Sequence, residues 1–511
     1  MLTRILASFC LCLLSSSVAF AQASPDPIAA LAEAAPFAVT PGALLAAGLA
    51  AQAVTPEAVV VCPLVEMRYS FDDEGRCAQT YRCVFRARTK AAAEGWASFS
   101  QLFAPWNEER PEIRARVVAA DGEVRELDPR TIEEGGTGED SDDLYTDRRR
   151  VRAPLPAMAA GVVVEEETVT RERAAVLPAA GEVHRWRFSH GVTVLRTRLV
   201  LEFPGARPLA VERHLLAERG IAERRTESGG RTTLVFEAGR LDPETAAESN
   251  LPPEAPRAPD VEFTTGTSWA AVAEAYAAVI DRQIAGAATA TALARELAAG
   301  ATGAREVAGR IMARIARDVR YTGIEFAEAA VVPHPPAEVL ERRYGDCKDQ
   351  AALVVAMLRA AGVPAHVALL WAGTGEDVDP ALPGLGLFNH AIVYVPERGG
   401  EAAFWIDATS RTLRAGDLPL MDAGRHALVA AKGTTALSRT PEPDAAANAV
   451  VETREVFLAE DGPARVVETT EPRGLVEAGY RAQFDGDPAA IRASLERYGK
   501  EAYDAKTVTA V

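Results

Sequence analysis

A single cysteine stands where the sequence predicts the start of a helix. The stretch RYGDCKDQAALVVAMLRAAGVPA spans residues 343–365. Asp346 is a favourable N-cap residue, and Gly362 followed by Pro364 ends the helix. Cys347 then lies in the first helical turn, where unpaired backbone N–H groups and the helix dipole favour an anion. A thiolate at this place is a nucleophile, whereas an inert cysteine would fit better at an apolar position farther along the helix.

A histidine and an aspartate downstream can complete a nucleophilic site. The segments FNHAIVYV and AAFWIDAT are predicted strands joined by a short loop. An antiparallel hairpin centred on Arg398 and Gly399 places His390 directly opposite Asp407. Side chains opposed in this way have Cβ atoms about 5 Å apart, so the carboxylate can orient the imidazole and stabilise its protonated form. Cysteine, histidine and aspartate together are the groups that acyl transfer requires.

Each partner residue also has a purely structural explanation. His390 can be a histidine at a sheet edge, and Asp407 can cap the turn at Ala408 and Thr409. Among the other histidines, His334 in the rigid segment PHPP is the second candidate, because it precedes the cysteine helix and can line a cleft there. The sequence contains no CxxC, HExxH or clustered Cys/His spacing, so we expect neither a metal site nor a cofactor.

Composition narrows the class of protein. The 511 residues are enough for two to four domains, and a hydrophobic content of 48% supports packed cores. The formal net charge is −17, which argues against a nucleic-acid partner and against an anionic membrane surface. The oligomeric state is not readable from the sequence.

The N-terminus has the pattern of a secretory signal peptide. Residues 1–23 contain one arginine, a short apolar run and small-x-small cleavage motifs in VAFAQA. No later stretch has about 18 apolar residues without a charge, so we expect no membrane anchor after cleavage. The expected location is periplasmic or extracellular.

Three further cysteines follow the predicted signal peptide before Cys347. Cys77 and Cys83 lie on one predicted strand, too far apart for a disulfide. Cys62 and Cys83 can face each other across a hairpin, so the sequence does not decide whether they form a disulfide in an oxidising compartment. Cys347 is expected to be free.

Changes in hydrophobic period divide the remainder of the chain. Residues 24–57 are rich in alanine and proline and are predicted to be a linker with short helical pieces. Alternating strands with regular turn signals predict an all-β sandwich over residues 58–250. Residues 262–432 have helices first and antiparallel strands later, which indicates an α+β domain. Residues 445–511 begin another β unit with too few strands to close a sandwich, so we expect a partial β domain.

The motifs around the three candidate residues resemble the bacterial transglutaminase-like superfamily, whose fold is related to papain-like cysteine peptidases. The resemblance rests on VRYTGIEF, PHPPAEVLERRYGDCKDQAALVVAMLRAAGVPA, FNHAIVYV and WIDAT, in the order the family has them. It implies that Cys347 is the nucleophile, His390 the general base and acid, and Asp407 the orienting residue. In related enzymes an upstream aromatic side chain helps to polarise the substrate carbonyl, for which Tyr321 is the first candidate and Tyr344 the second.

The preceding sandwich also has a resemblance. Its segments LFAPWNEERPEIRARVVAADGEVRELDP and LYTDRRRVRAPLPAMAAGVVVEEE look like an uncharacterised β-rich module that often precedes this domain in exported proteins of Gram-negative bacteria. The resemblance implies no activity for the module.

Three functional hypotheses follow. The first is an exported cysteine-dependent acyl-transfer enzyme acting on a protein or peptide amide of the cell envelope, by hydrolysis or by isopeptide cross-linking. The second is a catalytically inactive envelope scaffold that binds a partner through the sandwich. The third is a metal or redox role for Cys62, Cys77 and Cys83. The acyl donor and acceptor are not readable from the sequence.

Overall fold

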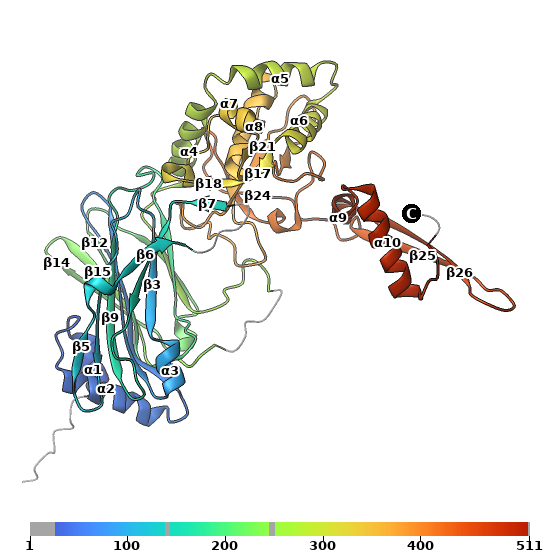
Figure 1. The fold of residues 1–511 in the computed structure, drawn as a ribbon. Helices are drawn as coiled ribbons and strands as arrows, with labels where there is room; N and C mark the ends of the chain where they lie inside the picture. Colours follow the sequence, from blue (N-terminus) through green and yellow to red (C-terminus); the bar gives the residue numbers. More distant parts are fainter. Residues whose placement is uncertain (1–25, 138–143, 245–250, 509–511) are drawn as a thin grey trace, which may run out of the picture.

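The computed structural model describes residues 26–137, 144–244 and 251–508, so the predicted signal peptide lies outside the described residues. An N-terminal β-rich domain, a central α+β domain and a C-terminal unit follow one another along the chain (Figure 1). In these described ranges no helix combines the length and apolar character needed to cross a membrane.

A nine-stranded sheet forms the centre of the N-terminal domain. Its strand order is β14-β15-β12-β1-β2-β9-β4-β5, with β11 beside β1. Alternation of apolar residues gives the sheet two buried faces: along β2, Val84 packs on one side, and Cys83 and Phe85 pack on the other. The strands are β1 (Val60–Phe71), β2 (Cys77–Ala87), β4 (Glu112–Val118), β5 (Val124–Glu126), β9 (Val163–Arg171), β11 (Thr193–Val194), β12 (Thr197–Pro204), β14 (Ala222–Ser228) and β15 (Arg231–Ala238).

Two smaller sheets cover one face of the large sheet and make the domain the predicted β-sandwich. The first has the order β3-β8-β6, and the second has the order β10-β16-β13. Phe263 of β16 packs edge-on against Tyr69 of β1, with ring centroids 4.9 Å apart. The strands are β3 (Ser98–Phe103), β6 (Glu133–Gly136), β8 (Arg149–Pro154), β10 (Val183–Arg187), β13 (Ala210–His214) and β16 (Asp260–Thr264), and helix α3 (Lys90–Gly95) precedes β3.

Strand β16 moves the domain boundary relative to the sequence prediction. The α+β domain was expected to begin at residue 262, after the proline-rich stretch. Instead, Asp260–Thr264 pairs with both β10 and β13 as the middle strand of the second small sheet. The reason is local: five consecutive buried residues in a strand conformation complete this sheet before the first helix of the next domain starts at Trp269.

The short helical pieces predicted within residues 24–57 are present, but the prediction of a linker is wrong, because both helices are packed onto the sandwich. Helices α1 (Pro27–Glu33) and α2 (Pro41–Val54) cover the second face of the large sheet. Leu44 is 0% exposed and packs in one cluster with Leu64 and Val163. Small residues permit this close approach, since a Cβ added to Gly48 would lie 2.6 Å from Cγ2 of Val163. The alanines that suggested a linker therefore allow the two helices to pack closely on the sheet.

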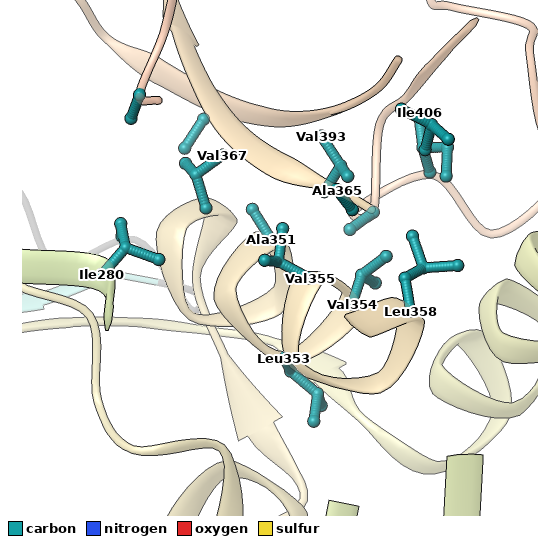
Figure 2. Packing of buried hydrophobic residues seen from close by; sticks show 14 of the residues in the cluster. Ile280, Ala351, Leu353, Val354, Val355, Leu358, Ala365, Val367, Val393 and Ile406 are labelled. Carbon is teal, nitrogen blue, oxygen red and sulfur yellow. The ribbon is translucent and has the colours of Figure 1, made fainter. Parts of the chain in front are cut away.

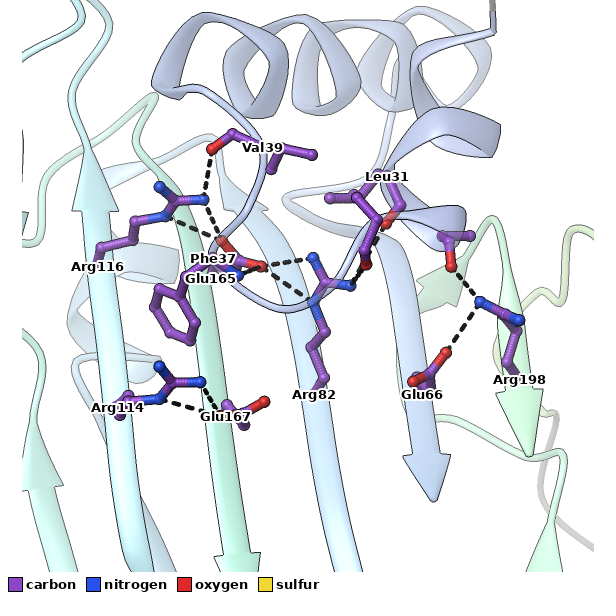
Figure 3. A network of polar contacts seen from close by, with 12 residues as sticks. Leu31, Phe37, Val39, Glu66, Arg82, Arg114, Arg116, Glu165, Glu167 and Arg198 are labelled. Atoms are coloured by element: carbon purple, nitrogen blue, oxygen red, sulfur yellow. Dashed lines mark hydrogen bonds and ion pairs between the residues drawn. The ribbon is translucent and has the colours of Figure 1, made fainter. Parts of the chain in front are cut away.

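A buried carboxylate ties these helices to the sheet (Figure 3). Glu165 of β9 is 0% exposed, and its two carboxylate oxygens pair with Arg82 at 2.6 Å and Arg116 at 2.5 Å. The backbone N–H of Phe37, between α1 and α2, donates to Glu165 Oε1 at 3.0 Å. Arg116 also donates to the carbonyl oxygen of Val39 at 2.9 Å. Because both arginines are buried, the network depends on the single carboxylate between them.

In the central domain, helix α8 is enclosed by helices and by a sheet. Its residues Val354 and Val355 are fully buried, and Figure 2 shows them among side chains from the neighbouring elements. The sheet has the order β22-β21-β20-β23-β24. The elements are α4 (Trp269–Ile284), α5 (Ala288–Ala298), α6 (Ala304–Asp318), α7 (Pro336–Arg342), α8 (Cys347–Ala360), β20 (His366–Leu370), β21 (His390–Val395), β22 (Phe404–Ile406), β23 (His426–Val429) and β24 (Ser438–Arg439).

Short strands connect the two domains, and the last unit projects from them. Strand β7 (Leu144–Thr146) of the sandwich pairs in parallel with β18 (Gly323–Glu325) of the central domain, whereas β17 (Arg320–Tyr321) and β19 (Tyr344–Gly345) pair within the central domain. The C-terminal unit extends away from the other domains (Figure 1). It consists of a β-hairpin and two helices: β25 (Ala449–Phe457), β26 (Arg465–Arg473), α9 (Leu475–Gln483) and α10 (Pro488–Tyr503).

The Glu165 network generates a stability prediction. Replacing Glu165 by alanine leaves two buried arginines without their carboxylate, so we expect a loss of about 3–5 kcal/mol in the free energy of unfolding. The matched control is Glu167→Ala on the same strand, whose partner Arg114 is largely exposed, and it should cost at most about 1 kcal/mol. Urea unfolding followed by tryptophan fluorescence measures both. Equal destabilisation by the two variants would contradict the role given to Glu165.

Candidate active site

Cys347 begins helix α8, as the sequence predicts. Asp346 is the N-cap, and its Oδ1 accepts a hydrogen bond from the N–H of Asp349 at 3.1 Å. In return Asp349 Oδ2 accepts from the N–H of Asp346 at 3.3 Å, which completes a capping box. The predicted cap is confirmed, and the cysteine occupies the first helical position, where the helix dipole favours negative charge.

Asp349 also anchors the segment that precedes the helix. Its carboxylate accepts hydrogen bonds from the backbone N–H of His334 at 2.7 Å and from Arg342 at 2.7 Å, and the His334 ring lies 3.2 Å away. Burial opposes the charged form, but these bonds, first among them that of the His334 ring, keep the pKa of Asp349 below its ordinary value. His334, the second histidine candidate, therefore lies beside the helix cap. A Cβ on Gly345 would come within 2.8 Å of the Asp349 Cβ, so glycine is required there.

His390 and Asp407 lie together at the ends of two neighbouring strands. His390 is the first residue of β21, and Asp407 directly follows β22. The distance from His390 Nε2 to Asp407 Oδ2 is 3.3 Å. The other oxygen, Oδ1, accepts from the N–H of Thr409 at 2.8 Å and from its hydroxyl at 2.7 Å. Asp407 thus caps the following turn and orients the histidine at the same time, so the two explanations considered for it are compatible.

The strand register differs from the predicted one by two residues. The predicted hairpin, centred on Arg398 and Gly399, placed His390 opposite Asp407, whereas the structure pairs Val393 with Ile406. The turn is instead formed by Gly399 and Gly400, both with positive φ (62° and 84°), flanked by a bridge between Arg398 and Glu401. A two-residue turn of this kind needs positive φ at both positions, which glycine supplies. Asp407 reaches the histidine from beyond the end of its paired strand.

The charge of His390 depends on the groups around it. Burial alone would lower the pKa of the imidazole, but hydrogen bonds with Asp407 and Cys347 outweigh burial and raise this pKa to about 11. The same contact with His390 helps to hold the pKa of Asp407 below its ordinary value in spite of burial. Since Nε2 faces Asp407, the other ring nitrogen is free to serve the cysteine.

The two tyrosine candidates are placed differently. Tyr321 pairs across β17 and β19 with Gly345, two residues before the cysteine. Burial raises the pKa of the Tyr321 hydroxyl, and negative charge at Cys347 raises it further, which places the phenol near the thiol. The ring of Tyr344 instead lies under the guanidinium of Arg342, 4.7 Å from ring centroid to Cζ. The structure therefore brings Tyr321, rather than Tyr344, toward the candidate nucleophile.

The four cysteines of the described ranges are all free, and only Cys347 is partly exposed. Burial is the main cause that raises the pKa of Cys77. The Cys83 thiol contacts that of Cys62, and this hydrogen bond together with burial raises the pKa of Cys83. The disulfide left open between Cys62 and Cys83 is absent in this structure, although the two thiols touch. Exposure thus singles out Cys347 as the accessible thiol.

One carboxyl group at the site was missed by the sequence reasoning. Asp422 is 1% exposed, and its Oδ2 lies 3.9 Å from Nε2 of His390. It belongs to a short 3-10 helix, Leu420–Asp422, between β22 and β23. No short hairpin connects this segment to the histidine strand, so no spacing in the sequence signals the approach.

A long connection docked on the sandwich leads into the histidine strand. Residues 371–389 join β20 to β21. Arg187 of the sandwich holds the carboxylate of Glu376 at 2.7 Å. The N–H of Val183 donates to the carbonyl oxygen of Leu385 at 2.7 Å. These contacts fix the chain just before the candidate histidine, so the position of the histidine depends on both domains.

A second polar cluster has the composition of a metal site. His214, Asp260 and Glu262 offer ligand atoms within 4.8 Å of one another on β13 and β16. His214 Nδ1 lies 2.8 Å from Asp260 Oδ1, and Arg185 pairs with Glu262. Asp379 of the docked connection approaches His214 Nε2 at 3.7 Å. The contacts of His214 with Asp260 and of Arg185 with Glu262 lie within one small sheet of the sandwich, and the approach of Asp379 ties this sheet to the docked connection.

Comparisons with known proteins agree with the geometry. The family profile of the transglutaminase-like superfamily matches residues 291–406, and that of a domain of unknown function with a solved structure, DUF3857, matches residues 73–245. No curated protein matches the chain. The chain therefore carries a transglutaminase-like core domain preceded by the DUF3857 β-rich module, which confirms the resemblance drawn from the motifs.

A solved structure shares the architecture. It is a crystal structure from Parabacteroides distasonis, described as a "putative protease". The two structures superpose with a TM-score of 0.58 at 15% sequence identity, over 76% of this chain and 72% of that chain. At this identity the likeness concerns the fold.

The contact between His390 and Cys347 generates a prediction on thiol reactivity. At pH 6, iodoacetamide should alkylate Cys347 at least about tenfold faster in the wild type than in His390→Ala, because the imidazolium stabilises the thiolate. His366→Ala on the neighbouring strand β20 is the matched control and should react like the wild type. Mass spectrometry of the Cys347 peptide measures the rates. The pairing is refuted if all three proteins react equally fast.

Proposed function

We propose that the chain is an exported cysteine-dependent acyl-transfer enzyme that acts on protein or peptide amides. The observation that carries the proposal is the position of His390, which contacts Asp407 at 3.3 Å and Cys347 at the start of a buried helix. The candidate base His390 thus lies between the nucleophile Cys347 and the orienting group Asp407, which is the order that covalent catalysis requires.

The reaction follows from these positions. The Cys347 thiolate attacks the carbonyl carbon of the amide, and a C–S bond forms. The developing oxyanion is stabilised by the N-terminus of α8, where the dipole and the first N–H groups point at the substrate. The C–N bond then breaks while His390 gives its proton to the leaving amine nitrogen. Asp407 keeps the imidazole oriented and stabilises its protonated form.

The acyl-enzyme has two possible fates that share this first half. Water, deprotonated by His390, releases a carboxylic acid and makes the protein an amidase or peptidase. A primary amine gives a new amide bond and makes it a cross-linking enzyme. Both return the thiolate and the protonated histidine.

Tyr321 is the candidate for carbonyl polarisation. Its phenol lies near the thiol and remains protonated, because burial and the nearby negative charge raise its pKa. A protonated phenol can donate a hydrogen bond to the substrate oxygen. Tyr344 is less suited, since its ring is covered by Arg342.

The location of the substrate follows from the N-terminus. Residues 1–23 have the pattern of a cleavable signal peptide, which would deliver the protein to the periplasm or the exterior. The substrate class is therefore a protein or peptide of the cell envelope.

The proposal predicts complete dependence on Cys347. Cys347→Ala should lower the turnover of peptide amides at least about a thousandfold, and His390→Ala should have a similar effect, because the residues act as a unit. Cys77→Ala, which removes a buried thiol, is the control and should keep wild-type turnover. Product analysis by mass spectrometry, with and without a fluorescent primary amine, separates hydrolysis from cross-linking. Unchanged turnover in Cys347→Ala would sink the proposal and favour a binding scaffold.

A further inference from the structure

A second carboxyl group stands behind the histidine–aspartate pair. Asp422 is buried to 1% exposure, and its Oδ2 has no hydrogen-bond partner among the described residues. One oxygen of its carboxyl group lies within 4.8 Å of an oxygen of Asp407 and of a ring nitrogen of His390. Its backbone is held in place, since the hydroxyl of Thr440 donates to the carbonyl oxygen of Asp422 at 2.6 Å. This bond fixes the backbone from which the buried carboxyl group projects.

Few charges surround Asp422. Asp407 approaches from the end of β22, and His390 approaches from the start of β21. Arg425, from the segment before β23, contributes positive charge, and its guanidinium donates to the carbonyl oxygens of Gly373 and Gly375 rather than to Asp422. Two carboxylates thus share one imidazolium.

Two ionised carboxylates in contact repel each other strongly, so one of them keeps a proton. Asp407 is the better anion, because Thr409 donates two hydrogen bonds to its Oδ1 and the histidine faces its Oδ2. Asp422 has none of these donors on its side chain. The proton therefore belongs on Asp422.

We propose that Asp422 is a positioning residue, which keeps its proton and donates a hydrogen bond to the Asp407 carboxylate, so that Asp407 is fixed toward His390. The inference rests on the proposed function of the triad and extends it by a fourth group. Asp422 itself reaches neither the thiol nor the substrate. It acts through Asp407, whose orientation would otherwise depend on Thr409 alone.

The electrostatics support this geometry. Burial, together with the charge and hydrogen bond of Asp407, raises the pKa of Asp422 to about 7, while His390 and Arg425 act in the opposite direction. Below about pH 7 the carboxyl group is neutral and can donate. Above it the proton is lost, and the two carboxylates repel each other beside the histidine.

The test uses the full-length protein and two readouts. The infrared difference between the wild type and Asp422→Asn should show the C=O stretch of one protonated carboxylic acid that disappears with a midpoint near pH 7, and the difference removes the bands of Glu166, Glu172 and Glu262, whose pKa values burial raises to about 7 as well. Alkylation of Cys347 at pH 6 should fall about tenfold in Asp422→Ala, the effect of one pKa unit on a thiolate. Asp422→Asn, whose amide can donate to Asp407, should stay within about threefold of the wild type, as rescue by a donor requires.

Asp417→Ala, five residues earlier on the same segment, is the matched control and should react like the wild type. The proposal is overturned if the infrared difference between the wild type and Asp422→Asn contains no such band, if Asp422→Ala reacts like the control, or if Asp422→Asn is as slow as Asp422→Ala. Neither readout needs a substrate. If no amide is turned over and yet the band titrates as expected, the proposed function fails while the carboxyl pair stands.

Discussion

The carboxylate of Asp349 is the contact on which the candidate site depends. It is fully buried and accepts hydrogen bonds from the backbone of Asp346 and His334 and from the side chain of Arg342. A helix that starts in the interior must have its first N–H groups satisfied by the protein, because water cannot do so. By joining the helix start to the two segments before it, Asp349 determines where Cys347 points. His390 and Asp407 are then brought by other elements to a thiol whose position is already fixed.

The sheet of the central domain and the sandwich together position His390 and Asp407. β21 begins with His390 and ends against α8, and Asp407 leaves β22 beside it. The chain before His390 is held by the sandwich through Glu376 and Leu385. His390, one of the three candidate residues of the transglutaminase-like core, therefore follows a segment that is held in place by the sandwich domain. The DUF3857 module is, in this chain, part of the support of the site.

Local signals in the sequence predicted the local structure well. The N-cap at Asp346 and the hairpin between β1 and β2 depend on neighbouring residues, and both were found. The pairing of His390 with Asp407 was expected for a partly wrong reason, since the register is displaced by two residues and the contact is made past the strand end. The turn type decided the register, and two consecutive glycines were the available clue.

Long-range packing was beyond the sequence patterns. The Ala-rich segment at 27–54 is read as a linker by composition, but small residues also let a helix lie close on a sheet. Strand β16 follows a proline-rich stretch and pairs with strands some fifty to eighty residues earlier, which no local period reveals. Asp422 reaches the histidine only because β23 and its preceding turn fold back along β20. Such contacts are set by tertiary structure.

The docked connection at residues 371–389 bears on how such a chain can evolve. Gly266 of the sandwich lies so close to it that a Cβ would be 2.1 Å from the carbonyl oxygen of Pro383. Fit of this kind, together with the pair between Arg187 and Glu376, cannot be inherited by one domain alone. We therefore expect the two domains to be inherited together. A recombination event that joined this core to the sandwich of another protein would displace His390, even though every residue of the core stayed the same.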